Sequence, residues 1–167
     1  MNGEVLKFAG ICKHLISGRV LEVGSLNVNG SIREVLPITI GVDMSEGKGV
    51  DAVVNVGDLL ETYGVDSFDC VVSCDALEHM EYWDSALANM WGVLKPDGWL
   101  FLTMAALSKG FHGYPSDYHR MTIDNFVRVF GDNAVPQSFV GKTSIGVLVK
   151  KSAPLDYSIR PVPPRPR

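Results

Sequence analysis

The chain has 167 residues, of which 46% are hydrophobic, and this is enough to bury the core of one globular domain. The formal net charge of -4, without a Lys/Arg run interleaved with aromatic residues, gives no indication of a nucleic-acid groove. The sequence has no basic start followed by an apolar signal core and no apolar run approaching ~20 residues, which favours a cytoplasmic protein without a membrane segment.

The end of the chain differs in composition from the rest. From Lys142 onward six basic residues face one acid, whereas the preceding nine basic residues face 18 acids. Five prolines fall within the last 14 residues, where apolar periodicity is almost absent. We therefore expect a domain over residues 1–153 and a disordered Pro/Arg-rich tail over residues 154–167.

Three cysteines, Cys12, Cys70 and Cys74, form no CxxC pair and no metal-ligand spacing. Cys70 and Cys74 lie in one expected strand, where four residues span roughly 13 Å, too far for a disulfide. Reduced thiols are the simplest interpretation.

Apolar periodicity and turn residues predict alternating helices and strands. Helices are expected over residues 4–17, 31–36, 83–94 and 122–130, and strands over 19–23, 38–42, 52–56, 68–73, 99–104, 135–140 and 145–150. A turn is expected at 95–98, and a long polar and aromatic loop at 105–121.

This order predicts an α/β fold of minimal size: a Rossmann-like, mostly parallel, seven-stranded sheet with helices on both faces and an antiparallel edge strand. Ligands of such sheets bind beyond the carboxyl ends of the strands. The expected ends lie at Gly24, Asp43, Asp58, Asp75 and the loop after Met104.

The loop after the first strand is a candidate cofactor site. Glycines at both ends, Gly24 and Gly30, permit close backbone approach to a ligand, and Ser25 lies between them. The G-x-G-x-x-G spacing of dinucleotide folds is missing, and Glu22 disfavours a phosphate. A carboxylate there suits the cationic amine of S-adenosylmethionine; a tight turn with a solvated Glu22 is the alternative.

The acids that end the next strands are further candidates. Asp43, about 20 residues after the glycine loop, is placed to accept two ribose hydroxyls, with Met44 packing on adenine. Asp58 could accept from the adenine amino group. Helix or turn capping is the alternative for both acids.

Several segments in order resemble class I methyltransferases of the type-11 group, over roughly residues 18–131. They are Glu22-x-Gly24, Gly41-Val42-Asp43, Gly57-Asp58, Phe68-Asp69-Cys70-Val71-Val72-Ser73, Leu77-Glu78-His79 and Val93-Leu94-Lys95-Pro96-Asp97-Gly98. The glycine loop departs from the common Gly-x-Gly-x-Gly pattern and resembles a smaller subgroup with Gly-Ser-x-x-Val-Asn-Gly. The resemblance implies S-adenosylmethionine as cofactor, Glu22, Gly24, Asp43 and Asp58 as cofactor residues, and Asp75 and His79 near the sulfonium and the acceptor.

The loop at 105–121 is the expected acceptor side. Its His112-x-x-Pro115-x-Asp117-Tyr118-x-Arg120 segment recurs in the resembled subgroup. We expect His79, His112, Tyr114, Tyr118 and Arg120 to contact the substrate. If an oxygen is methylated, the candidate bases are His112, His119 and Asp75. An alternative is that Asp117 and Arg120 pair to brace the loop, with Tyr118 buried beside them.

The sequence thus predicts methyl transfer from S-adenosylmethionine to a small-molecule acceptor. A non-catalytic S-adenosylmethionine-binding module and, less favoured, a nicotinamide-dependent oxidoreductase are the alternatives. The spacing of Asp75, His79, His112, Asp117 and His119 matches no metal signature, so no metal site is expected. Neither the acceptor atom nor the oligomeric state follows from the sequence.

Overall fold

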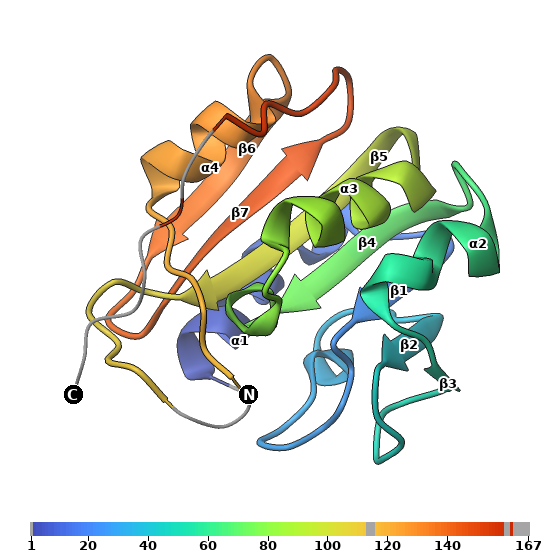
Figure 1. The fold of residues 1–167 in the computed structure, drawn as a ribbon, viewed down its shortest axis with the longest axis horizontal. Helices are drawn as coiled ribbons and strands as arrows, with labels where there is room; N and C mark the ends of the chain where they lie inside the picture. Colours follow the sequence, from blue (N-terminus) through green and yellow to red (C-terminus); the bar gives the residue numbers. More distant parts are fainter. Residues whose placement is uncertain (1, 113–115, 159–160, 162–167) are drawn as a thin grey trace.

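A computed structural model of the chain describes residues 2–112, 116–158 and 161 (Figure 1). Its helices are α1 (Gly3–Cys12), α2 (Leu59–Tyr63), α3 (Trp83–Val93) and α4 (Ile123–Phe130), with short 3-10 helices at Lys13–Leu15, Ile32–Glu34, Val56–Asp58 and Leu77–His79. The strands are β1 (Val20–Val23), β2 (Ile40–Asp43), β3 (Ala52–Val53), β4 (Phe68–Cys74), β5 (Leu94–Ala105), β6 (Ala134–Val140) and β7 (Ser144–Lys150).

The strands form one sheet in the order β3-β2-β1-β4-β5-β7-β6. The pairs from β3 to β5 are parallel, and β7 is antiparallel to both β5 and β6. This confirms the predicted mostly parallel α/β sheet with an antiparallel edge. The carboxyl ends of β1, β2, β4 and β5 consequently meet at one edge of the sheet, where ligands of such folds bind.

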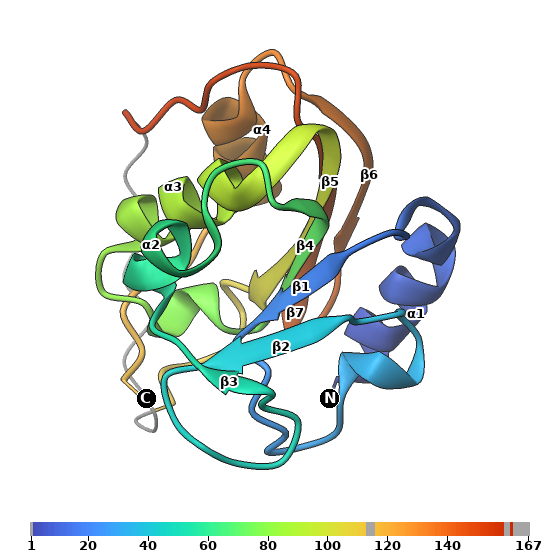
Figure 2. The same cartoon turned by 90° about the vertical axis from the view of Figure 1, so that its right-hand side faces the viewer.

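Helices cover both faces of the sheet (Figures 1 and 2). One face packs Leu21, Val23 and the apolar side of α3 and α4 into a core cluster. The other packs Val20 and Phe101 against α1 and the 3-10 helix Ile32–Glu34. Because successive strand residues point to opposite faces, Glu22 of β1 faces the α1 side together with Val20.

Local sequence explains where α1 and α4 begin. α1 begins where the side chain of Asn2 accepts the Glu4 N–H, and it buries Val5, Phe8, Ala9 and Cys12 at helical spacing. α4 begins at a capping box in which Thr122 and Asn125 each accept a hydrogen bond from the other's backbone N–H. Thr122, the first residue of the predicted helix, is thus its N-cap.

Some predicted boundaries differ from the structure. The first helix ends its α-helical part at Cys12 and continues as a 3-10 turn, and β3 has only two residues. The predicted turn at 95–98 lies inside β5, where it bulges between the pairs Phe68↔Leu94 and Cys70↔Trp99. The helix α2, which is five residues long, was not predicted.

The first residues assigned to the tail pack against the domain. The Asp156 N–H donates to the Val129 carbonyl at 2.8 Å, and Asn133 donates to the Ala153 carbonyl at 3.1 Å. Leu155 packs on the core, and the Tyr157 ring lies 6.4 Å from that of Trp83. Leu155, Asp156 and Tyr157 thus contact the domain; of the rest of the tail, Ser158 and residue 161 are among the described residues.

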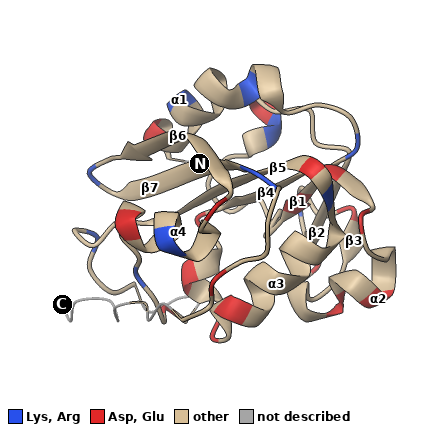
Figure 3. Cartoon of the chain, turned by 90° about the horizontal axis from the view of Figure 1, so that it is seen from above, with Lys and Arg blue, Asp and Glu red and all other residues tan. Residues whose placement is uncertain are grey.

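Acidic side chains predominate around α2, α3 and β3 (Figure 3). All three cysteines are buried and free. Among the residues that the structure describes, none of the helices combines the length and apolar character needed to cross a bilayer.

Candidate active site at the carboxyl edge of the sheet

Gly24 turns the chain sharply after β1. Its φ of +80° is in the left-handed region, and a Cβ at this position would lie 2.7 Å from the Ala76 Cβ. The N–H groups of Gly24 and Ser25 both donate to the Val42 carbonyl, at 2.9 and 3.0 Å. The loop is therefore tied to the end of β2, and only glycine is accommodated at its first position.

Glu22 is a buried carboxylate just before this turn. It is 3% exposed, and Arg33 Nε lies 3.5 Å from its Oε2. The approach lacks hydrogen-bond geometry, so Oε2 has no hydrogen-bond partner among the described residues. Arg33 also pairs with Asp51. Burial raises the pKa of Glu22 to about 7 against the opposing effect of the Arg33 charge.

Asp43 ends β2 at the same edge. Its carboxylate accepts the N–H groups of Leu26 at 3.2 Å and Ser45 at 3.1 Å. A carboxylate offers about four lone-pair positions, so acceptor capacity for two further donors remains. The carboxylate thus links the glycine loop to β2 and can still bind a ligand.

Four further predicted cofactor residues lie in the segments that follow β1, β2 and β3. Met44 is 73% exposed beside Asp43, and Asp58 is exposed at the end of the 3-10 helix Val56–Asp58. Gly30 has a φ of +102° and donates its N–H to Asn27 Oδ1 at 2.8 Å. Ser25 is buried, and its Oγ has no hydrogen-bond partner among the described residues.

Asp75 follows β4 in a strained backbone conformation, with a φ of +48°. Its carboxylate accepts hydrogen bonds from the hydroxyls of Thr103 at 3.0 Å and Ser144 at 3.1 Å. β5 and β7 therefore hold this side chain in one orientation.

Glu78 lies in the Leu77-Glu78-His79 motif and was not predicted as a site residue. Its side chain is 0% exposed, and Oε1 accepts the Ala105 N–H at 3.0 Å. Oε2 has no hydrogen-bond partner among the described residues. Burial raises the pKa of Glu78 to about 8. The only sequence signal was an acid next to a candidate histidine.

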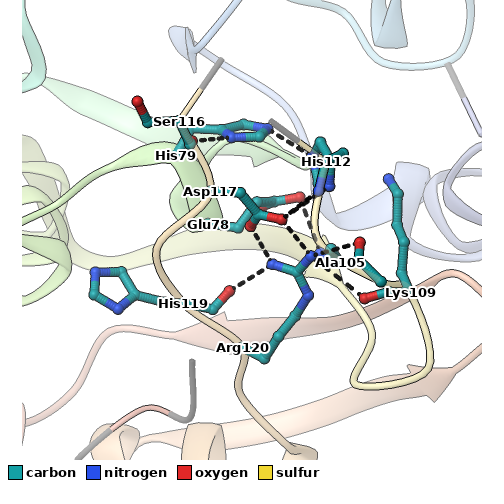
Figure 4. Close-up of polar contacts among 10 residues, drawn as sticks. Glu78, His79, Ala105, Lys109, His112, Ser116, Asp117, His119 and Arg120 are labelled. Carbon is teal, nitrogen blue, oxygen red and sulfur yellow. Dashed lines mark hydrogen bonds and ion pairs between the residues drawn. The ribbon is translucent and has the colours of Figure 1, made fainter. Parts of the chain in front are cut away.

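His79 and His112 meet at this edge (Figure 4). Their Nε2 atoms are 3.3 Å apart, and the rings are perpendicular with centroids 4.9 Å apart. His79 Nδ1 lies 2.7 Å from the Ser116 carbonyl, and His112 Nδ1 lies 3.0 Å from Asp117 Oδ2. Burial lowers the pKa of each histidine. The structure thus joins two predicted acceptor residues separated by 33 positions.

A buried ion pair braces the loop that carries His112. Arg120 is 0% exposed and pairs with Asp117, and it also donates to the His119 carbonyl at 2.8 Å (Figure 4). Burial raises the pKa of Asp117, but the hydrogen bonds from Arg120 and from the His112 N–H at 3.0 Å outweigh it, so that the pKa is lowered. This arrangement matches the bracing alternative for the Asp117 and Arg120 pair.

The remaining loop residues predicted for the site are less enclosed. Tyr118 is 36% exposed, rather than buried beside the ion pair. His119 Nε2 lies 2.8 Å from the Glu81 carbonyl, away from the two paired histidines. Tyr114 lies outside the described residues.

Solved structures of similar fold are methyltransferases. The 1,6-didemethyltoxoflavin-N1-methyltransferase of Burkholderia thailandensis, solved with S-adenosylhomocysteine, is 16% identical; the match covers 89% of this chain and 79% of that one, with a TM-score of 0.67. A possible histamine N-methyltransferase of Thermotoga maritima is 17% identical, with coverage of 89% and 92% and a TM-score of 0.66. A putative methyltransferase solved with the Haloferax volcanii Trm112 activator is 14% identical, with coverage of 87% and 88% and a TM-score of 0.59.

The sheet order and the strand-end site define a class I methyltransferase fold, and the sequence matches a family model in the same region. Residues 21–102, from β1 into β5, match the type-11 model described as a methyltransferase domain. The chain is similar to this family over 82 of its 167 residues, and it is an enzyme that uses S-adenosylmethionine. A search among curated proteins found no match.

Proposed function

We propose that this enzyme methylates a small-molecule acceptor at the carboxyl edge of β1, β2, β4 and β5. The observation that carries the proposal is the meeting of His79 and His112 at this edge, beside the ends of β4 and β5. Two of the structural neighbours are named for small-molecule acceptors, a didemethyltoxoflavin and, as a possible substrate, histamine. The free, buried cysteines suit a reducing compartment, and we place the enzyme in the cytoplasm.

The cofactor half of the proposed site is the edge from β1 to β3. The buried Glu22, whose Oε2 has the Arg33 ion pair but no hydrogen bond among the described residues, suits the cationic amine of the cofactor, and the Gly24 turn lets backbone approach a ligand closely. We propose that the Asp43 carboxylate accepts hydrogen bonds from the two ribose hydroxyls of the cofactor. The further contacts that we propose are Ser25, Gly30, Met44, Asp58, Asp75 and His79.

The acceptor half is formed by His79, His112 and the exposed Tyr118, with Tyr114 as a proposed contact outside the described residues. When bound, S-adenosylmethionine supplies an activated methyl group, and the protein has to align the acceptor and exclude water. Arg120 is enclosed by its pairing with Asp117, so we assign it the indirect role of holding His112 in place.

An oxygen acceptor also has to lose a proton, and the geometry ranks the three candidate bases. Asp75 already accepts two hydroxyls, and His119 Nε2 is engaged by the Glu81 carbonyl. The Nε2 atoms of His79 and His112 face each other instead of a backbone group. We therefore favour His112 as the residue nearest to the reacting oxygen.

The test first identifies the acceptor by incubating the enzyme with cell extract and methyl-labelled cofactor. We expect His112→Ala then to lower the rate of labelling by about 100-fold or more, the usual effect of losing a general base, while the affinity for S-adenosylhomocysteine changes by less than about twofold. His14→Ala is the matched control, because His14 is exposed and bonds only within its own turn, to the Ile11 carbonyl. Equal loss of binding and labelling, or loss of neither, would refute the assigned role.

A further inference from the structure

Three potential metal-ligating side chains converge beside the end of β5. One ligand atom from each of Glu78, His79 and His112 can be chosen so that all three lie within 4.8 Å of one another (Figure 4). Glu78 and His79 belong to the 3-10 helix after β4, whereas His112 comes from the loop after β5. Sequence spacing could not reveal this set, because the ligands come from two separate loops.

The second ring nitrogen of each histidine lies beside an oxygen acceptor. A carbonyl oxygen can only accept, so His79 Nδ1, at 2.7 Å from the Ser116 carbonyl, carries the proton of this ring. His112 Nδ1 lies 3.0 Å from Asp117 Oδ2 but has no hydrogen-bond partner among the described residues, so it is the charge of the carboxylate that favours a proton on that nitrogen. With a proton on each Nδ1, both neutral rings present a lone pair on Nε2. In metal-ligating histidines the distal nitrogen commonly lies next to a carbonyl or carboxylate.

The separation of the two lone pairs fits one shared cation. Two nitrogens at about 2.0–2.1 Å from a tetrahedral Zn²⁺ lie about 3.3 Å apart, given a bond angle near ~109°. The two Nε2 atoms are 3.3 Å apart. A direct N–H···N hydrogen bond would be expected nearer to about 3.0 Å. Without a proton or a cation between them, the two lone pairs repel each other.

Glu78 supplies an independent observation. Its side chain is 0% exposed, and Oε2 has no hydrogen-bond partner among the residues that the structure describes. Such a buried oxygen costs about 1–3 kcal/mol unless something binds it. The other carboxylate in contact with the histidines, Asp117, is already paired with Arg120. Glu78 is therefore the carboxylate available to a cation here.

We propose that Glu78, His79 and His112 bind one divalent cation of borderline softness, with Zn²⁺ as the best match. Two imidazoles and one carboxylate are a ligand set that such ions accept, and three protein ligands leave a fourth position open. The ligand atoms lie within 4.8 Å of one another, wider than the about 3.3 Å of a set bound to one ion, so binding requires a side-chain adjustment.

The fourth, open coordination position of the ion indicates the class of methyl acceptor. This inference about the acceptor rests on the proposed methyl transfer. A hydroxyl oxygen bound there loses its proton more readily, as water does on Zn²⁺. With the cation bound, His112 acts as a ligand and not as the base itself: the hydroxyl proton passes to water, and the freed oxygen pair forms the C–O bond. The electron pair of the broken C–S bond stays on sulfur. We infer that the acceptor is an alcohol, a phenol or a similar hydroxyl compound.

The experiment is a calorimetric titration of the full-length, chelator-treated enzyme with Zn²⁺ alone, without acceptor. We expect one ion per chain, and a loss of affinity of at least about tenfold in His112→Ala, His79→Gln and Glu78→Gln. The glutamine at position 78 keeps an acceptor for the Ala105 N–H, so it tests the charge without opening the backbone contact. His14→Ala and His119→Ala are controls for surface and loop histidines, and both are expected to bind as the wild type does.

Co²⁺ titration adds a spectroscopic readout, with ligand-field bands of nitrogen and oxygen ligation and no thiolate charge-transfer band. The metal site would be overturned by any of three results: no one-to-one binding, thiolate bands, or an equal loss of Zn²⁺ affinity in the two control variants. Such a result would favour a proton shared between the two histidines. S-adenosylhomocysteine titration and thermal melting are run on every variant to verify folding. Cofactor binding without Zn²⁺ binding removes this inference alone, whereas Zn²⁺ binding without cofactor binding removes the proposed function and the acceptor class.

Discussion

Glu22→Gln is expected to stabilise the cofactor-free enzyme at neutral pH while weakening cofactor binding. Burial raises the pKa of Glu22 from 4.5 to about 7. The folded state therefore holds this proton more tightly than the unfolded state does, and the resulting stability is fully present below pH 4.5. It is lost as the pH rises to about 7, because ionisation then occurs in a buried position.

The size of the effect follows from that shift. About 2.5 pKa units correspond to about 3 kcal/mol of unfolding free energy between pH 4.5 and pH 7. Glutamine has nearly the same shape and stays neutral, so the variant should match the wild type below about pH 4. At pH 7.5 it should exceed the wild type by up to about 3 kcal/mol. Urea denaturation across this range measures the difference.

The same proton links pH to cofactor binding. If the charged form of Glu22 receives the amine, wild-type affinity for S-adenosylhomocysteine should rise by nearly tenfold per unit of pH below about 7 and flatten above it. The glutamine variant should bind more weakly and show a much flatter profile from pH 5.5 to 7.5. A variant that is no more stable at pH 7.5 than the wild type would refute the buried-charge argument. Equal affinity in both proteins would refute the assignment of the amine.

Two further predictions concern structure outside the cofactor contacts. Arg120→Met leaves the Asp117 carboxylate buried without its partner. We expect the variant to lose about 3–5 kcal/mol of unfolding free energy, measured by urea denaturation. A loss below about 1 kcal/mol would show that the ion pair does not brace the loop. A chain ending at Ser158 should have the same melting temperature as the full chain. A chain ending at Ala153 should have a lower one, because it loses the packing of Leu155 and Tyr157. Equal melting temperatures of the two truncated chains would show that the domain ends at Ala153.

The sheet was predictable because its strands are apolar runs ended by acids or glycines. The buried strand at 68–73 and the capped helix at 122–130 appear within a residue of their predicted ends. α2 was missed, since five residues are too few for helical periodicity to be recognised. The parallel direction of most strands followed from the alternation of helices and strands, which local patterns encode.

The acceptor side was predictable only in part. The motif around His112 indicated a site, but no spacing rule relates His112 to His79 across 33 positions. The burial of Glu78 depends on how the loop after β5 folds back over the 3-10 helix, where the Tyr118 N–H donates to the Glu78 carbonyl at 2.8 Å. Side-chain roles set by such loop contacts emerge from tertiary packing and not from local sequence.

The most direct test of the account is calorimetric titration of the wild type and Asp43→Ala with S-adenosylhomocysteine and with NAD. We expect the wild type to bind one S-adenosylhomocysteine per chain and no NAD. In a folded Asp43→Ala variant, two ribose hydroxyls lose a charged acceptor worth about 1.5–3 kcal/mol, which corresponds to a loss of affinity of about 10- to 150-fold. Binding of NAD, or unchanged affinity of the variant for S-adenosylhomocysteine, would contradict the proposed cofactor site at the carboxyl edge of the sheet.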